Sequence, residues 1–208
     1  MRRCTGERVG MWEAAFQAIF SPLPALVAMS NRSAAPDLRY PIGRADRRTS
    51  LTPDERRAAI DALALAPEAL RAAVRGLTDE QLDTLYRPGG WTARQLVHHV
   101  ADSHQNAYIP FKLGLTETDP TIKPYDQDSW VTLPDSALPV VVSLDLLDGV
   151  HTRLVSLLRA TPGTAFSRTI QHPENGPMTL DQMLGVYAWH GRHHTAHVTS
   201  LRERMGWS

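Results

Sequence analysis

The sequence predicts an all-α protein, an antiparallel up-and-down bundle of four long helices. Apolar residues recur with helical spacing in four long segments, and strand-like patterns are limited to short extended pieces. The 15 prolines and 13 glycines punctuate these helices rather than mark a disordered chain. With 208 residues, 42% of them hydrophobic, the chain is long enough to form one domain with a substantial core.

The first long helix begins at Thr52, an N-cap that is followed by a proline at the first helical position and by acidic residues in the first turn. It runs to about residue 75, and Pro67 predicts a break or a kink within it. Thr78 repeats the capping pattern for a short helix that ends near residue 85. Thr92 then begins the second long helix, which ends near residue 115.

Residues 116–142 are expected to form a long irregular loop, because they carry several turn signals. A connection of this length is typical of a lid or a docking surface. Candidates to shape a pocket there are Tyr125, Asp126 and Trp130. The third long helix is predicted at about 143–160, and a second loop at 166–178. The fourth long helix is then expected to begin at Thr179.

The N-terminal residues 1–28 have some features of a signal peptide, with two arginines ahead of an apolar region. Charged residues and two prolines interrupt that region, and no small-residue cleavage site follows it. The polar stretch that begins at Met29 is typical of a disordered terminus. We therefore expect residues 1–35 to be an appendage or a misassigned start, residues 36–208 to form the domain, and the protein to be cytoplasmic.

The composition argues against several partners and cofactors. Basic and acidic residues balance at 22 each, so no basic surface for nucleic acid or for an anionic membrane is expected. No apolar run approaches the roughly 20 residues of a membrane-spanning helix. The single cysteine, Cys4, excludes an intramolecular disulfide and cysteine-based zinc motifs. Any metal must therefore be held by histidines and carboxylates.

The fourth long helix contains four of the nine histidines. His190 and His194 lie one turn apart, as do His193 and His197, so either pair could chelate a metal ion. The stripe of this helix that faces the core includes His190 and His194, whereas His193 lies at its flank. Two imidazoles in an apolar core require a hydrogen-bond partner or a metal. We therefore favour a metal site over an accidental cluster.

A catalytic zinc site usually has three protein ligands. The candidates for the third are His98, His99 and His104 on the second long helix. Periodicity places His104 nearest the apolar centre and His99 on a polar edge, and spacing alone leaves the three open. Asp102 is a candidate to orient a ligand imidazole. An equally good interpretation makes it a surface acid paired with Arg94 or His98.

Two segments resemble the signatures of the DinB/YfiT superfamily. They are Gly-Gly-Trp-Thr-Ala-Arg-Gln-Leu-Val-His-His-Val-Ala-Asp-Ser-His at 89–104 and Trp-His-Gly-Arg-His-His-Thr-Ala-His at 189–197. The similarity to the YfiT branch continues through 40–43, 81–83, 111–113 and 204–208, and it covers the chain from about residue 39 to its end.

This resemblance implies a four-helix bundle, commonly a cytoplasmic homodimer, with one zinc or nickel ion. It implies that His99, His190 and His194 hold the metal, and so selects His99 over His104.

The resemblance to the YfiT branch also implies a metal-dependent hydrolase that acts on a small molecule. A three-histidine site leaves room for zinc to activate water. The same site could instead hold a low-molecular-weight thiol such as bacillithiol for S-transfer, as in relatives elsewhere in the superfamily. A third interpretation is a metal-binding dimeric bundle without catalysis. The sequence lacks His-Glu-x-x-His and identifies no general base.

Overall fold

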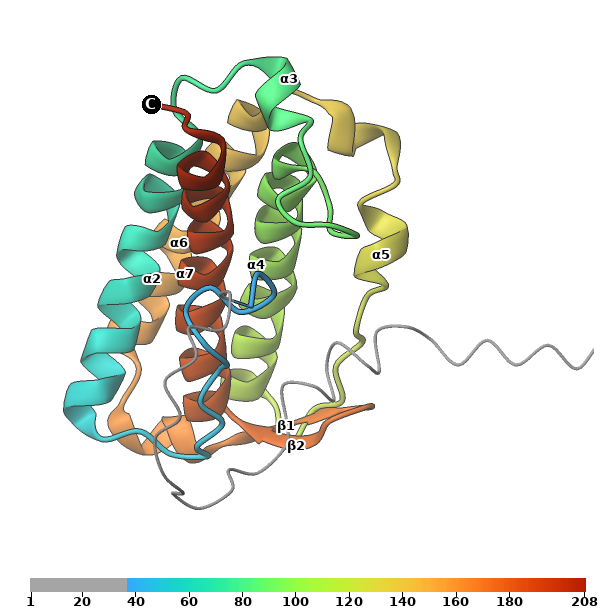
Figure 1. Ribbon diagram of the computed structural model, residues 1–208. Helices are drawn as coiled ribbons and strands as arrows, with labels where there is room; N and C mark the ends of the chain where they lie inside the picture. Colours follow the sequence, from blue (N-terminus) through green and yellow to red (C-terminus); the bar gives the residue numbers. More distant parts are fainter. Residues whose placement is uncertain (1–36) are drawn as a thin grey trace, which may run out of the picture. The chain divides into compact units, whose positions relative to one another are not determined.

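The structure, a computed structural model, describes residues 37–208, and Figure 1 shows its arrangement. The four long helices are α2 (Pro53–Val74), α4 (Ala93–Thr116), α6 (Val140–Ala160) and α7 (Leu180–Met205). The short helical segments are α3 (Asp79–Leu82), α5 (Gln127–Trp130), η1 (Pro134–Ala137) and η2 (Gly163–Ser167). The predicted all-α four-helix bundle is therefore confirmed. The predicted appendage at 1–35 lies outside the described residues.

The helix directions follow from the residues that meet across the bundle. α4 contacts α6 with the two chains running the same way, since His98 meets Ser143 and His104 meets His151. α7 runs opposite to α4, since its His190 meets His104 while Leu180 lies against Gly114. Strict alternation along the chain, as expected from the sequence, would have made α4 and α6 antiparallel. The connection at 117–139 is long enough to return the chain to the end at which α4 began (Figure 1).

Capping boxes fix the starts of three helices at the predicted residues. The hydroxyls of Thr52, Thr78 and Thr92 each accept from the backbone N–H three residues later. In each box the Glu or Gln at that later position accepts from the backbone N–H of its threonine. α6 begins at Val140, after Pro139, a few residues earlier than predicted. The sequence therefore located the starts of the three helices that have capping boxes, and it was less accurate for α6, which has no side-chain cap.

The predicted break at Pro67 is not present, because α2 continues from Pro53 to Val74 through it. A proline inside a helix lacks the N–H that would bond the carbonyl four residues earlier. Here that carbonyl belongs to Leu63, and it accepts a hydrogen bond from His151 of α6 instead. The tertiary contact thus satisfies the group that the proline leaves unbonded.

The predicted loop at 166–178 contains a two-stranded antiparallel hairpin, which corrects that expectation. Its strands are β1 (Thr169–His172) and β2 (Gly176–Thr179), and Thr169 pairs with Thr179. Gly176 closes the turn with a φ of 72°, a conformation that favours glycine. Ile170 of β1 is buried against the bundle. The strands are four residues each, so their alternating pattern was too short to separate from a loop.

The core consists of two apolar clusters with a polar layer between them. The hairpin-end cluster contains Ile60, Leu63, Ala107, Phe111, Leu154, Val155, Leu158, Phe166, Ile170, Leu180, Met183, Leu184 and Ala188. The opposite-end cluster contains Leu70, Ala73, Val74, Leu82, Tyr86, Ala93, Leu96, Val97, Val100, Ala101, Leu144, Leu147, Val198 and Leu201. Each of α4, α6 and α7 contributes one stretch to each cluster. Between these stretches lie buried or half-buried histidines, namely His104, His151, His190, His193, His194 and His197, and His99 adjoins this layer through His190.

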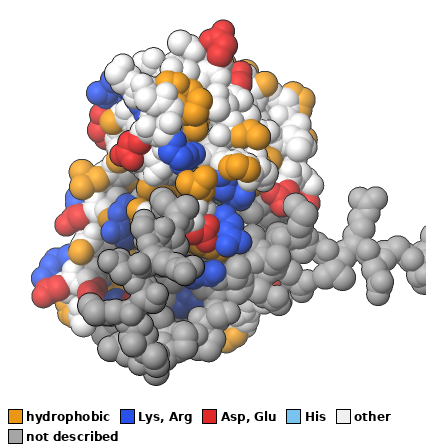
Figure 2. Space-filling view, viewed as in Figure 1, with side chains coloured by type: hydrophobic (Ala, Val, Ile, Leu, Met, Phe, Trp, Pro, Cys, Tyr) orange, Lys and Arg blue, Asp and Glu red, His pale blue; other side chains and the backbone are white. Residues whose placement is uncertain are grey.

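The surface agrees with the balanced charge of the chain. On the face seen in Figure 2, basic and acidic side chains are interspersed with apolar ones. Within residues 37–208, no helix is long and apolar enough to span a membrane.

Candidate metal centre

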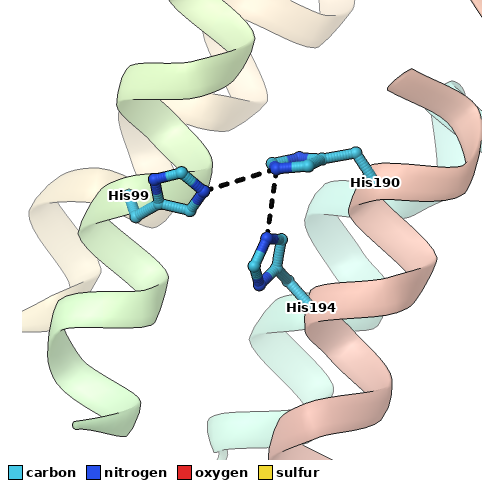
Figure 3. Close-up of side chains that lie close together, drawn as sticks. All are labelled: His99, His190 and His194. Carbon is cyan, nitrogen blue, oxygen red and sulfur yellow. Dashed lines mark hydrogen bonds between the residues drawn. The ribbon is translucent and has the colours of Figure 1, made fainter. Parts of the chain in front are cut away.

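Three histidine side chains converge where α4 faces α7. His99 extends from α4, and His190 and His194 extend from adjacent turns of α7 (Figure 3). The Nε2 atom of His190 lies 3.3 Å from Nε2 of His99 and 3.1 Å from Nε2 of His194. One nitrogen from each ring lies within 4.8 Å of the others. The structure thus brings together the three residues that the resemblance selected.

This geometry fits a single divalent ion. Two nitrogens bound to one tetrahedral zinc at about 2.0–2.1 Å lie roughly 3.3 Å apart. The His190 Nε2 distances of 3.3 and 3.1 Å match that separation. Three imidazoles also leave coordination positions for a water or a substrate group, as catalytic zinc sites do. His99 and His194 are buried, and His190 is half-buried.

The environment keeps these imidazoles neutral. Burial, with a smaller contribution from the neighbouring His193, lowers the pKa of His99 to about 3. Burial likewise holds the pKa values of His190 and His194 well below their usual range, and neighbouring imidazoles reinforce the effect. Neutral imidazole is the form that binds a metal. At neutral pH the three rings therefore present lone pairs without having to lose a proton.

The contacts of His99 differ from those suggested by the sequence. Its Nδ1 lies 3.4 Å from the hydroxyl of Tyr125, a residue of the loop that precedes α5. Its ring packs against Trp91, with ring centroids 4.6 Å apart. Asp102, the candidate orienting residue, makes no side-chain hydrogen bond to His99 within the described part of the chain. The long loop therefore supplies an aromatic neighbour that helical spacing could not locate.

Comparisons with known proteins identify the family of this chain. The sequence pattern of the DinB superfamily matches residues 62–198. The chain belongs to the DinB superfamily. Relatives from Bacillus mycoides and Bacillus cereus are each 52% identical over 171 residues, covering 82% of this chain and 99% of theirs. Both carry the name "Putative metal-dependent hydrolase".

A solved structure is also similar to this DinB-superfamily chain. YfiT from Bacillus subtilis is 48% identical, with a TM-score of 0.80, and the match covers 82% of this chain and 99% of YfiT. YfiT is described as a probable metal-dependent hydrolase with an unusual four-helix bundle topology.

The other two candidates for the third ligand in this DinB-superfamily protein face elsewhere. His98 points to α6, with Nδ1 2.7 Å from the Ser143 hydroxyl and Nε2 3.0 Å from the Leu138 carbonyl. His104 is fully buried, and its Nε2 lies 3.1 Å from Nδ1 of His190. Its Nδ1 contacts His151, so both ring nitrogens of this core histidine have partners, and the contact with His190 was not expected from the sequence.

The second histidine pair of α7 forms a separate contact. Nε2 of His193 and Nε2 of His197 lie 3.0 Å apart, and both side chains are buried. His193 stacks on Trp189, and His197 packs against Tyr86. Among the described residues, no third metal-ligating side chain joins this pair.

Sequence reasoning missed His151 of α6. It is 2% exposed, and it bonds both His104 and the carbonyl of Leu63. The available signal was the helical proline Pro67, which leaves that carbonyl without its usual donor and so calls for a polar partner nearby.

Proposed function

We propose that this protein is a metal-dependent hydrolase, in which His99, His190 and His194 hold one divalent ion. The convergence of three neutral imidazole nitrogens within 4.8 Å carries the proposal. The names of the relatives and of YfiT support it. Zinc is our first choice of metal and nickel the second, since both suit imidazole ligands. A small-molecule substrate, a homodimer and a cytoplasmic location are part of the same proposal.

The chain's own residues have separate roles in this proposal. The three histidines would hold the ion, which would supply activated water as the nucleophile for hydrolysis near neutral pH. The Tyr125 hydroxyl lies 3.4 Å from Nδ1 of His99, and in this proposal it accepts from that Nδ1–H, so that Nε2 of His99 carries the lone pair. Trp91 packs on the same ring and limits its rotation. No general base is assigned, because the Asp102 carboxylate makes no described contact with the three rings.

The metal is tested by elemental analysis of the purified full-length chain. We expect one divalent ion per chain, and loss of that ion in His194→Ala. His98→Leu is the matched control, because it also removes a buried imidazole but one that faces α6. Full metal retention in both His194→Ala and His99→Ala, with loss in His104→Ala, would contradict the assignment.

The reaction is tested on the same proteins. We expect metal-dependent turnover of at least one member of a panel of small esters and amides, lost in His194→Ala and kept in His98→Leu. Cobalt substitution followed by titration with low-molecular-weight thiols provides the alternative arm. A saturable sulfur-to-cobalt charge-transfer band without hydrolysis would replace hydrolysis with S-transfer. No response in either assay would overturn the proposal in favour of a non-catalytic metal-binding bundle.

A further inference from the structure

A continuous chain of buried hydrogen bonds leads away from the candidate metal centre across the bundle. Nδ1 of His190 lies 3.1 Å from Nε2 of His104, and Nδ1 of His104 lies 2.8 Å from Nε2 of His151. Nδ1 of His151 lies 2.6 Å from the carbonyl oxygen of Leu63 on α2. These three hydrogen bonds thus link α7, α4, α6 and α2. His104 and His151 are 0% and 2% exposed, so water does not compete for these bonds.

The last member of this chain determines the direction of every hydrogen bond. A carbonyl oxygen only accepts, and the carbonyl of Leu63 has no helical donor, because the residue four positions later is Pro67. Nδ1 of His151 must therefore carry the proton and donate it. A neutral imidazole has one N–H, so Nε2 of His151 is an acceptor.

The same reasoning passes from ring to ring. The acceptor on His151 requires that Nδ1 of His104 carry the proton, which leaves Nε2 of His104 as an acceptor. That acceptor in turn requires a proton on Nδ1 of His190. Nε2 of His190 is then left with its lone pair, and it is the atom that faces His99 and His194.

We propose that His104 and His151 are positioning residues that hold His190 in its Nδ1–H tautomer. They do so through a hydrogen-bond relay that runs from His190 through His104 and His151 and ends at the Leu63 carbonyl. The proposal rests on the proposed function, because it gives the relay the role of presenting Nε2 of His190 to the metal. It goes beyond that function because it assigns a role to two residues that touch neither metal nor substrate. The hydrogen bonds of both residues depend on the Leu63 carbonyl of α2, which has no helical donor because Pro67 lacks an N–H.

His98 offers an internal contrast in the same protein. Its Nε2 faces the Leu138 carbonyl, so that nitrogen carries the proton, and its Nδ1 accepts from the Ser143 hydroxyl. His98 is therefore in the opposite tautomer to the three relay histidines. A single spectrum can report both states.

The decisive measurement is ¹⁵N NMR of the imidazole rings in the metal-free, full-length protein. We expect His104, His151 and His190 to show a protonated Nδ1 and an unprotonated Nε2, and His98 to show the reverse. An Nε2–H tautomer at His104 or His190 in the unmodified protein overturns the proposal. This measurement requires neither metal nor substrate, so a failed hydrolysis assay leaves its result intact.

Variants of His151 test whether the relay matters for metal binding. His151→Leu removes the acceptor for Nδ1 of His104, which favours a shift of the proton to Nε2 of His104 and reversal of the His190 tautomer. Cobalt affinity should fall by about 10–100-fold, as for loss of other groups that orient metal-bound histidines. His151→Gln offers both a donor for Leu63 and an acceptor for His104, and should restore the wild-type tautomers and most of the affinity.

His98→Leu is the matched control, because it removes a buried imidazole that bonds another backbone carbonyl, and its cobalt affinity should stay within about twofold of wild type. Equal losses of affinity in His151→Leu and His98→Leu, or unchanged affinity and tautomers in His151→Leu, would show that the relay has no positioning role. If the protein binds no cobalt at all but shows the expected tautomers, the metal proposal fails and the relay stands as a structural device.

Discussion

The two apolar clusters and the histidine layer between them all lie inside the bundle, yet they contribute to the protein in different ways. A buried leucine stabilises the fold by the apolar area that it removes from water, and it needs no particular partner. A buried imidazole must find a partner for each nitrogen, and leaving one unbonded has a free-energy cost. In this layer the partners are mainly other imidazoles, with a backbone carbonyl at the far end.

This difference between the clusters and the layer indicates that stability and chemistry depend on separate parts of the bundle. The apolar clusters at both ends hold the four helices in register, and the layer between them carries groups that cannot ionise easily. Among the described residues, Nδ1 of His193 and of His194 have no hydrogen-bond partner, so the layer is incompletely satisfied. We therefore expect the clusters to dominate stability, and the layer to dominate responses to pH and metal.

The largest expected effect is a loss of stability in acid that comes from the buried histidines. Burial lowers the pKa values of His99 and His197 to about 3, whereas unfolded histidine titrates near 6.5. Between these values the unfolded state binds more protons, so stability is complete above about pH 6.5 and falls as the pH approaches 3. Each such histidine should lower the free energy of unfolding by up to about 1.4 kcal/mol per pH unit.

Denaturant unfolding of the metal-free protein at pH 7.5, 6 and 5 measures this slope. His197→Phe should reduce the slope of unfolding free energy against pH by up to the contribution of one histidine, about 1.4 kcal/mol per pH unit. A phenyl ring can keep the packing against Tyr86 but does not titrate. Equal stability at pH 7.5 and 5 would contradict the expected difference between layer and clusters.

The second effect is the cost of a truncation in the opposite-end cluster. Leu70 is 1% exposed, and Leu70→Ala should lower the free energy of unfolding by about 2–5 kcal/mol. Leu65 lies on the same helix and is 68% exposed, so Leu65→Ala should change it by less than about 0.5 kcal/mol. Both variants should retain metal while folded. Loss of metal from folded Leu70→Ala would show that the cluster and the layer are not independent.

The third effect is stabilisation by metal. Zinc at about 100 times its dissociation constant should raise the free energy of unfolding by about 2.7 kcal/mol relative to the chelator-treated protein. Thermal unfolding with and without zinc measures the shift. His99→Ala should lose the shift, whereas Leu70→Ala should keep it on a less stable background. A shift of the same size in His99→Ala would place the zinc elsewhere.

The smallest effect comes from the cap of the helix that carries His99. The Thr92 hydroxyl accepts from the N–H of Gln95 at 3.1 Å, so Thr92→Ala should lower the free energy of unfolding by about 1 kcal/mol. Metal content should not change, since the cap lies about two turns from His99. Thr92→Ser retains the hydroxyl and should recover most of the stability. A metal-free Thr92→Ala protein that remains folded would link the cap to the site.

The sequence by itself determined the features that depend on local contacts. The threonine caps located the starts of α2, α3 and α4, since each cap is a hydrogen bond within four residues. The spacing of four placed His190 and His194 on one face of α7, because a helix turns every 3.6 residues. The bundle class followed from the same periodicity. The short hairpin did not, since four-residue strands carry too little pattern.

Only the tertiary structure decided which neighbour each face meets. His98, His99 and His104 point in known directions around α4, but the sequence does not say that α6 lies beside His98 and α7 beside His99. That arrangement depends on the parallel run of α4 and α6, which the long connection at 117–139 permits.

The relay through His151 is decided in the same way. Pro67 leaves a carbonyl free by local chemistry, and packing alone brings a donor from 88 residues away to meet it. Hydrogen bonds between residues close in sequence can be predicted from those residues alone, whereas contacts between helices depend on how the whole chain packs.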